Sequence, residues 1–216
     1  MDGCESDFAG MYRGLYIKFF DWGIQYYVAA RFCSMAKLMP VNGNLYHHAV
    51  EMLLKGQLSK KLPPEELKKR FGHNLPSLWQ AFKHEVPNET IARYDVVITE
   101  LHRFESIRYP DVVFREGMGL ISSWNRTPEP PAPQGIFANV PRYSIAVTEM
   151  DEFIGELFRL CDMNLSAYMG AYFLNEHAAM VLENENPACR GWFPERERLR
   201  SIGIDAMATR RKSRTG

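Results

Sequence analysis

The feature that most constrains this chain is the spacing of its apolar residues, which recur at steps of three and four along most of its length. That spacing gathers apolar side chains on one face of an α-helix. Prolines and glycines such as Pro40 and Gly72 separate the amphipathic segments. We expect helices over residues 23–39, 45–58, 64–71, 75–86, 91–109, 148–161 and 167–182. The sequence therefore predicts a mainly all-α protein.

The pattern changes between residues 112 and 147, where we expect an insertion into the helical domain. Residues 112–114 and the alternating residues 143–147 have the composition of short strands. Residues 126–135 are rich in proline, which removes backbone donors and fixes φ. The sequence predicts a short β-ribbon or loop insertion here. Thr148, followed three residues later by Asp151, resembles a capping box at the start of the next helix.

The length of 216 residues suits one main domain with additions. We interpret residues 1–22 as an N-terminal segment, 23–185 as the helical domain and 186–216 as a C-terminal extension. The extension alternates acidic and basic residues and ends in a basic run. We expect this tail to be solvated or disordered, with a contact to nucleic acid or an acidic partner as the alternative.

Charge and cysteine usage argue against several classes of protein. The formal net charge is zero, so the chain lacks the long-range positive field by which general nucleic-acid binders collect phosphates. No apolar stretch approaches the roughly 20 residues of a membrane-spanning helix, and the N-terminus lacks the basic start of a signal peptide. The four cysteines lack the paired spacing of zinc or redox sites. We expect a cytoplasmic protein with free thiols, no cofactor, no metal site and no membrane contact.

Three short segments carry polar residues in a distinctive order. Residues 46–56 read YHHAVEMLLKG, residues 72–78 begin with GHNL, and residues 101–111 end in RYPD. Together, in this order and at these distances, the three segments resemble the HEPN family, a helical domain named for nucleotide binding in higher eukaryotes and prokaryotes. The resemblance covers roughly residues 23–114, with weaker support from residues 148–182.

The resemblance implies an up-and-down helical bundle, often a homodimer, that acts as a partner of nucleotidyltransferases or as a metal-independent ribonuclease. In the ribonuclease branch an Arg precedes a His by roughly four to six residues on one helix, so that both groups flank the scissile phosphate. That spacing is missing from this sequence. Arg70 lies too close to His73, and Arg93 lies too far from His102. No later Arg is followed by a His before His177.

The candidates for ligand or partner binding in the three segments are His48, Glu51, Lys55, His73, Asn74, Arg108, Tyr109 and Asp111. By their spacing, His48, Glu51 and Lys55 share one helix face. The alternative for Glu51 and Lys55 is an ordinary surface ion pair worth about 0.3–0.5 kcal/mol. Asn74 stands at a helix boundary, where Asn is a preferred N-cap. Arg108 either binds a phosphate or pairs with Glu51 or Asp111 inside the bundle.

We interpret the chain as a non-catalytic HEPN-like protein that binds a nucleotide, RNA or a protein partner through the face of His48, Glu51, Lys55, His73 and Arg108. The protein partner would be a nucleotidyltransferase or an antitoxin. Two alternatives stay open: a toxin-like, metal-independent endoribonuclease with a non-standard active site, and a structural dimerisation module. Exposed His and Arg side chains in a cleft would favour the enzyme, and a buried, internally paired set would favour the scaffold.

Overall fold

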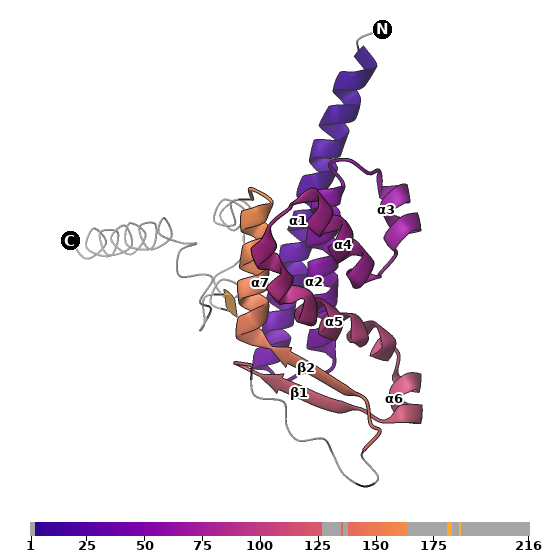
Figure 1. The fold of residues 1–216 in the computed structure, drawn as a ribbon, viewed down its shortest axis with the longest axis vertical. Coiled ribbons are helices and arrows are strands. Elements are labelled where there is room, and N and C mark those ends of the chain that lie inside the picture. The colour runs from indigo at the N-terminus through magenta and orange to yellow at the C-terminus, as the bar shows by residue number, and fades with distance from the viewer. Residues whose placement is uncertain (1–2, 127–134, 136–137, 164–180, 183–185, 187–216) are drawn as a thin grey trace, which may run out of the picture.

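The computed structural model describes residues 3–126, 135, 138–163, 181–182 and 186, with side chains from residue 14 onward. The prediction of a mainly helical bundle with a small β insertion is confirmed (Figure 1). The α-helices are α1 (Gly3–Met35), α2 (Val41–Leu58), α3 (Pro64–Phe71), α4 (Leu75–Glu85), α5 (Asp95–Arg103), α6 (Pro110–Glu116) and α7 (Val147–Leu160). Two 3₁₀ helices, η1 (Glu89–Tyr94) and η2 (Phe104–Ile107), flank α5.

Helix α1 is longer than the apolar pattern predicted, because it begins at Gly3 rather than at Gly23. It packs side by side with α2 and extends beyond the rest of the bundle at its N-terminal end (Figure 1). Phe20 is fully buried and contacts Phe158 of α7, with ring centroids 5.4 Å apart. Residue 22, taken as the end of a separate N-terminal segment, therefore lies inside a continuous helix.

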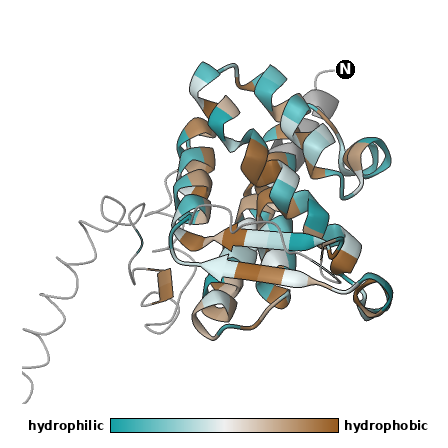
Figure 2. Cartoon of the chain, turned by 60° about the horizontal axis from the view of Figure 1, so that its bottom comes forward, coloured by the Kyte–Doolittle hydropathy of each residue, from teal (hydrophilic) through white to brown (hydrophobic). Residues whose placement is uncertain are grey.

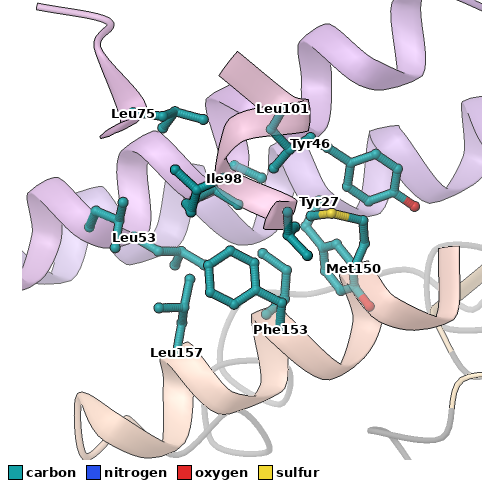
Figure 3. Packing of buried hydrophobic residues seen from close by; sticks show 14 of the residues in the cluster. Tyr27, Tyr46, Leu53, Leu75, Ile98, Leu101, Met150, Phe153 and Leu157 are labelled. Atoms are coloured by element: carbon teal, nitrogen blue, oxygen red, sulfur yellow. The ribbon is translucent and has the colours of Figure 1, made fainter. Parts of the chain in front are cut away.

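One hydrophobic core joins α1, α2, α4, α5 and α7. Helix α7 presents Phe153 to this core, where its ring stacks on Tyr94 at 4.6 Å and meets Trp79 edge-on at 5.4 Å. Figure 3 shows Phe153, Met150 and Leu157 projecting from α7 towards the residues of the other helices. In Figure 2 the outward faces of the helices carry more hydrophilic colour than their inward faces.

A close approach between two segments explains the glycine at position 43. Residues 42–44, which lie between the helices predicted over residues 23–39 and 45–58, belong to the first turn of α2. A Cβ built on Gly43 would lie 2.0 Å from the Cδ1 atom of Phe104, far inside van der Waals contact. Phe104 is fully buried in η2, so the absence of a side chain at Gly43 lets η2 pack directly on α2.

The insertion contains two strands, β1 (Gly119–Ser123) and β2 (Arg142–Ala146), which pair in parallel with Gly119 opposite Arg142. The prediction of β2 is confirmed, whereas β1 was not predicted. The prediction of a strand at residues 112–114 is wrong, because these residues lie in α6. Pro110 occupies the first turn of α6, and Gly117, with φ at 72°, ends it.

The predicted capping box at the start of α7 is also wrong. Helix α7 begins at Val147, and no side chain caps it. The Thr148 hydroxyl instead donates to the carbonyl of Trp124 at 3.0 Å. Asp151 points into the core. Its carboxylate accepts hydrogen bonds from Nε of Arg31 at 2.8 Å and from Nη2 of Arg31 at 2.9 Å. This buried pair ties α7 to α1.

Other sequence predictions concern the helix over residues 91–109, the cysteines, the segments towards the C-terminus and membrane spanning. The single helix predicted over residues 91–109 is divided into η1, α5 and η2. Cys33 and Cys161 are buried free thiols. Most of the predicted helix at 167–182, the proline-rich loop and the C-terminal tail lie outside the described residues. Among the described helices, none has both the length and the apolar character needed to cross a membrane.

Candidate functional site

The candidate site is built around the carboxylate of Glu51, which is fully buried on α2. Lys55, one helical turn further on, donates a hydrogen bond from Nζ to Oε1 of Glu51 at 2.5 Å. The same ammonium donates to the carbonyl of Gly72 at 2.7 Å. Lys55 is itself buried, so this pair is an internal link between α2 and the turn before α4, rather than the surface ion pair considered from the sequence.

Two histidines complete the surroundings of the Glu51 carboxylate. The turn between α3 and α4, where Gly72 has a φ of 53°, brings His73 to α2. Nδ1 of His73 lies 3.1 Å from Oε1 and 3.0 Å from Oε2 of Glu51. Nδ1 of His48 lies 3.3 Å from Oε2. The structure thus brings together four of the predicted residues, His48, Glu51, Lys55 and His73.

These contacts set the ionisation of Glu51. Burial alone would raise the pKa of this carboxyl, but hydrogen bonds from His48, His73 and Lys55 outweigh burial, and the pKa lies at about 2 instead of its usual 4.5. Glu51 is therefore a carboxylate at neutral pH. Neighbouring hydrogen-bond donors stabilise its negative charge, and burial shields that charge from solvent.

The pKa of Glu51 predicts an acid-sensitive part of the stability. The folded pKa is below the unfolded one, so the contribution is present above about pH 4.5 and is lost as the pH falls towards about 2. We expect the wild type to lose on the order of 2–3 kcal/mol more than Glu51→Gln across this range. Urea unfolding of both proteins at several pH values measures the difference. Parallel pH profiles would contradict the assignment.

His47 extends the cluster towards the third segment. It is almost fully buried, and its Nδ1 lies 3.2 Å from the carbonyl of Leu101. A carbonyl only accepts, so Nδ1 carries the proton in this contact. Nε2 lies 3.8 Å from Oε2 of Glu51 and 3.8 Å from Oε2 of Glu105, and has no hydrogen-bond partner among the described residues. Burial lowers the pKa of His47 and favours its neutral form.

Glu105 connects this cluster to Arg108. The Arg108 guanidinium lies 3.4 Å from Oε1 of Glu105, at the exposed end of η2. The expected pairing of Arg108 with Glu51 or Asp111 is wrong, since Glu105 is the acid that it meets. A chain of polar side chains therefore runs through His73, Glu51, His47, Glu105 and Arg108, and joins all three segments singled out in the sequence. We call this set, together with His48 and Lys55, which contact the Glu51 carboxylate, the polar chain.

The remaining predicted residues lie outside the polar chain. The Asn74 side chain accepts a hydrogen bond from the backbone N–H of Ser77 at 2.9 Å and caps α4, as the capping interpretation predicted. Tyr109 is 66% exposed. Asp111 forms an ion pair with Arg115 at 3.6 Å on the surface of α6. None of these three contacts Glu51 in the interactions that the structure gives.

Sequence reasoning missed His47, His102 and Glu105. The His102 ring stacks on that of His47 with centroids 6.2 Å apart, and its Nδ1 is buried without a hydrogen-bond partner in the described part of the chain. His47 lies within the first segment, and a histidine so close to His48 was a signal of a larger cluster. For His102 and Glu105, only the fold reveals that η2 and α5 face α2.

A separate cavity of about 450 Å³ lies between α5 and the two strands. Three arginines line it, Arg103, Arg126 and Arg142, together with acidic Asp95 and Glu100. Arg126 is held by ion pairs to Glu149 at 2.7 Å and Glu100 at 3.2 Å. None of the predicted site residues lines this cavity.

The comparisons with known proteins leave the family open. No protein-family model, curated protein or solved structure gives a significant match to the chain. The HEPN resemblance therefore rests on the three sequence segments and stays a prediction.

Proposed function

We propose that this chain is a non-catalytic HEPN-like protein that binds a protein partner through the exposed ends of the polar chain. The observation that carries the proposal is the mutual pairing of its charged members. The buried Glu51 and Lys55 bind each other, and the partly exposed Glu105 pairs with Arg108. Groups committed in this way position their neighbours and are not free to transfer protons to a substrate. This arrangement argues against catalysis and fits either partner binding or a structural dimerisation module, so the choice between these two depends on the exposed residues described below.

The charges favour a protein partner over a nucleotide or RNA. A phosphate approaching His48 and His73 would meet the ionised Glu51 directly behind them. The cations of the polar chain, Lys55 and Arg108, are both paired with carboxylates. The net charge of zero adds no attraction for phosphates at long range.

The exposed side chains near Arg108 are of the types that anchor protein interfaces. Tyr109 follows Arg108 directly and is 66% exposed, and Phe114 on α6 is 92% exposed. Arg and Tyr are enriched among the residues that carry most of the binding energy at interfaces. The resemblance suggests a nucleotidyltransferase or an antitoxin as the class of partner.

Co-purification tests the proposal. We expect the tagged wild type to retain one partner in stoichiometric amount, and Arg108→Ala/Tyr109→Ala to lose it while keeping its unfolding temperature. Lys68→Ala/Lys69→Ala, a double exchange of exposed residues on α3, is the control and should retain the partner. Equal retention by both double variants, or no stoichiometric partner for the wild type, would contradict the proposal. Light scattering measures the molar mass of the purified chain and so tests for the homodimer that the resemblance implies.

A metal-independent endoribonuclease is the second candidate, because the rings of His48 and His73 lie with centroids 6.0 Å apart. Two histidines at this distance are suited to act as general base and general acid on an RNA phosphodiester. Labelled RNA in excess chelator tests this candidate with His48→Ala, His73→Ala and the exposed control His84→Ala. Cleavage that only His84→Ala retains would replace the binding proposal with the enzyme.

A further inference from the structure

One carboxylate oxygen of Glu51 and two imidazole nitrogens lie close enough together to hold a metal ion. Oε2 of Glu51 lies 3.3 Å from Nδ1 of His48 and 3.0 Å from Nδ1 of His73. One ligand atom from each of these three residues lies within 4.8 Å of the other two. Zinc bonds of about 2.0–2.2 Å place neighbouring ligands of a tetrahedral site about 3.3 Å apart. The two separations from Oε2 of Glu51 are close to that value.

Lys55 fixes the orientation of the Glu51 carboxylate. Its ammonium is bonded to Oε1 and to the carbonyl of Gly72, so it stays on one side of the carboxylate. Oε2 is left to face the two histidines. A carboxylate with one oxygen held by a neighbouring donor is a common outer-shell arrangement for a monodentate ligand.

His47 supplies an independent observation. Its Nε2 is buried, has no hydrogen-bond partner among the described residues, and lies 3.8 Å from the same Oε2 atom of Glu51. Its Nδ1 meets the Leu101 carbonyl at 3.2 Å, which leaves the lone pair of a neutral ring on Nε2. Histidines that ligate metals almost always donate their other N–H to such a carbonyl or carboxylate. An unpaired buried lone pair beside a carboxylate is available to a hydrogen-bond donor or a cation.

We propose that His48, Glu51 and His73 bind a divalent transition-metal ion of the zinc type, which replaces the protons that Nδ1 of the two histidines donates to Glu51 in the metal-free chain. Nε2 of His47 is a further nitrogen beside the site. Imidazole ligands select Zn²⁺, Ni²⁺ or Cu²⁺ over Mg²⁺ and Ca²⁺, which prefer oxygen ligands. The ion joins α2 to the turn between α3 and α4, and the half-exposed position of His73 leaves one side open to solvent. This inference does not depend on the proposed function.

The spacing of the ligands explains why the sequence predicted no metal site. His48 and Glu51 are three residues apart on α2, but His73 comes from a different element and from 22 residues beyond Glu51. Only the turn at Gly72 brings it to the pair. The short regular spacings typical of metal motifs are therefore absent.

Calorimetric titration of the tag-free, chelator-treated chain with Zn²⁺ tests the site. We expect one equivalent to bind to the wild type and to the exposed control His84→Ala, and Mg²⁺ not to compete. His73→Ala should weaken the affinity for Zn²⁺ by at least about tenfold, as should His48→Ala. The two substitutions lie on different elements. If one variant does not fold, the Zn²⁺ affinity of the other still tests the site.

Equal Zn²⁺ affinity for His73→Ala, His48→Ala and the wild type would overturn the proposal, as would no binding to a folded wild type. Glu51→Gln tests the oxygen ligand separately, because the amide keeps the shape of the side chain but lacks its charge. Thermal unfolding with and without Zn²⁺ provides a second readout. Only the proteins that bind the ion should gain unfolding temperature in its presence.

Discussion

Asp151→Ala should lower the free energy of unfolding by about 3–5 kcal/mol, because it leaves the guanidinium of Arg31 buried without its counter-ion. Both side chains are fully buried, and two hydrogen bonds of 2.8 and 2.9 Å join them. The Tyr27 hydroxyl donates to the same carboxylate at 2.5 Å and would lose its acceptor as well. Urea unfolding followed by circular dichroism measures the change.

Two variants control this prediction. Arg159→Ala breaks an exposed ion pair with Glu156 and should cost no more than about 1 kcal/mol. Arg31→Met/Asp151→Leu removes both buried charges and should be more stable than Asp151→Ala, since apolar replacements leave no unpaired ion. A loss below about 1 kcal/mol for Asp151→Ala would show that the pair does not hold α1 to α7.

The second large effect is expected from Phe153→Ala on α7. The ring is fully buried between Tyr94 and Trp79, and truncation of a buried Phe typically costs about 3–5 kcal/mol. The loss combines the transfer of the ring into water with the cavity that it leaves. The midpoint of thermal or urea unfolding should fall accordingly.

Phe114→Ala is the matched control, since it is the same exchange on a ring that is 92% exposed. We expect it to change stability by less than about 0.5 kcal/mol. If the two exchanges had similar effects, Phe153 would not occupy the centre of the core as described. A large loss for Phe153→Ala alone would support α7 as an integral layer of the bundle.

The sequence predicted most of the helices because their apolar residues follow a regular period. It was wrong where that period is short or ambiguous. Residues 112–114 are β-branched and aromatic, yet Pro110 and Asp111 start a helix that places Phe114 in solvent. Strand β1 was missed because its sequence, GLISS, does not alternate clearly and residues 124–141 separate it from its partner. Parallel pairing is a long-range property that local patterns do not encode.

Regular helical spacing also made part of the candidate site predictable. The i, i+3 and i+4 spacing placed Glu51 and its neighbours on one face, but it indicated surface residues, whereas Glu51 and Lys55 are buried. Their burial depends on how the α3–α4 turn covers α2, which no local spacing shows. The prediction for Arg108 overlooked Glu105, which is three residues away and therefore a neighbour on a helix surface.

Because Gly43 lies against Phe104, substitutions at these two positions should occur together. A side chain at position 43 needs the space that the ring at position 104 occupies. Relatives with a residue larger than glycine at position 43 should therefore carry a residue smaller than phenylalanine at position 104. Relatives with large residues at both positions should be rare. An exchange at 43 alone would displace η2 and with it Glu105. The surroundings of the His47 side chain would then change as well.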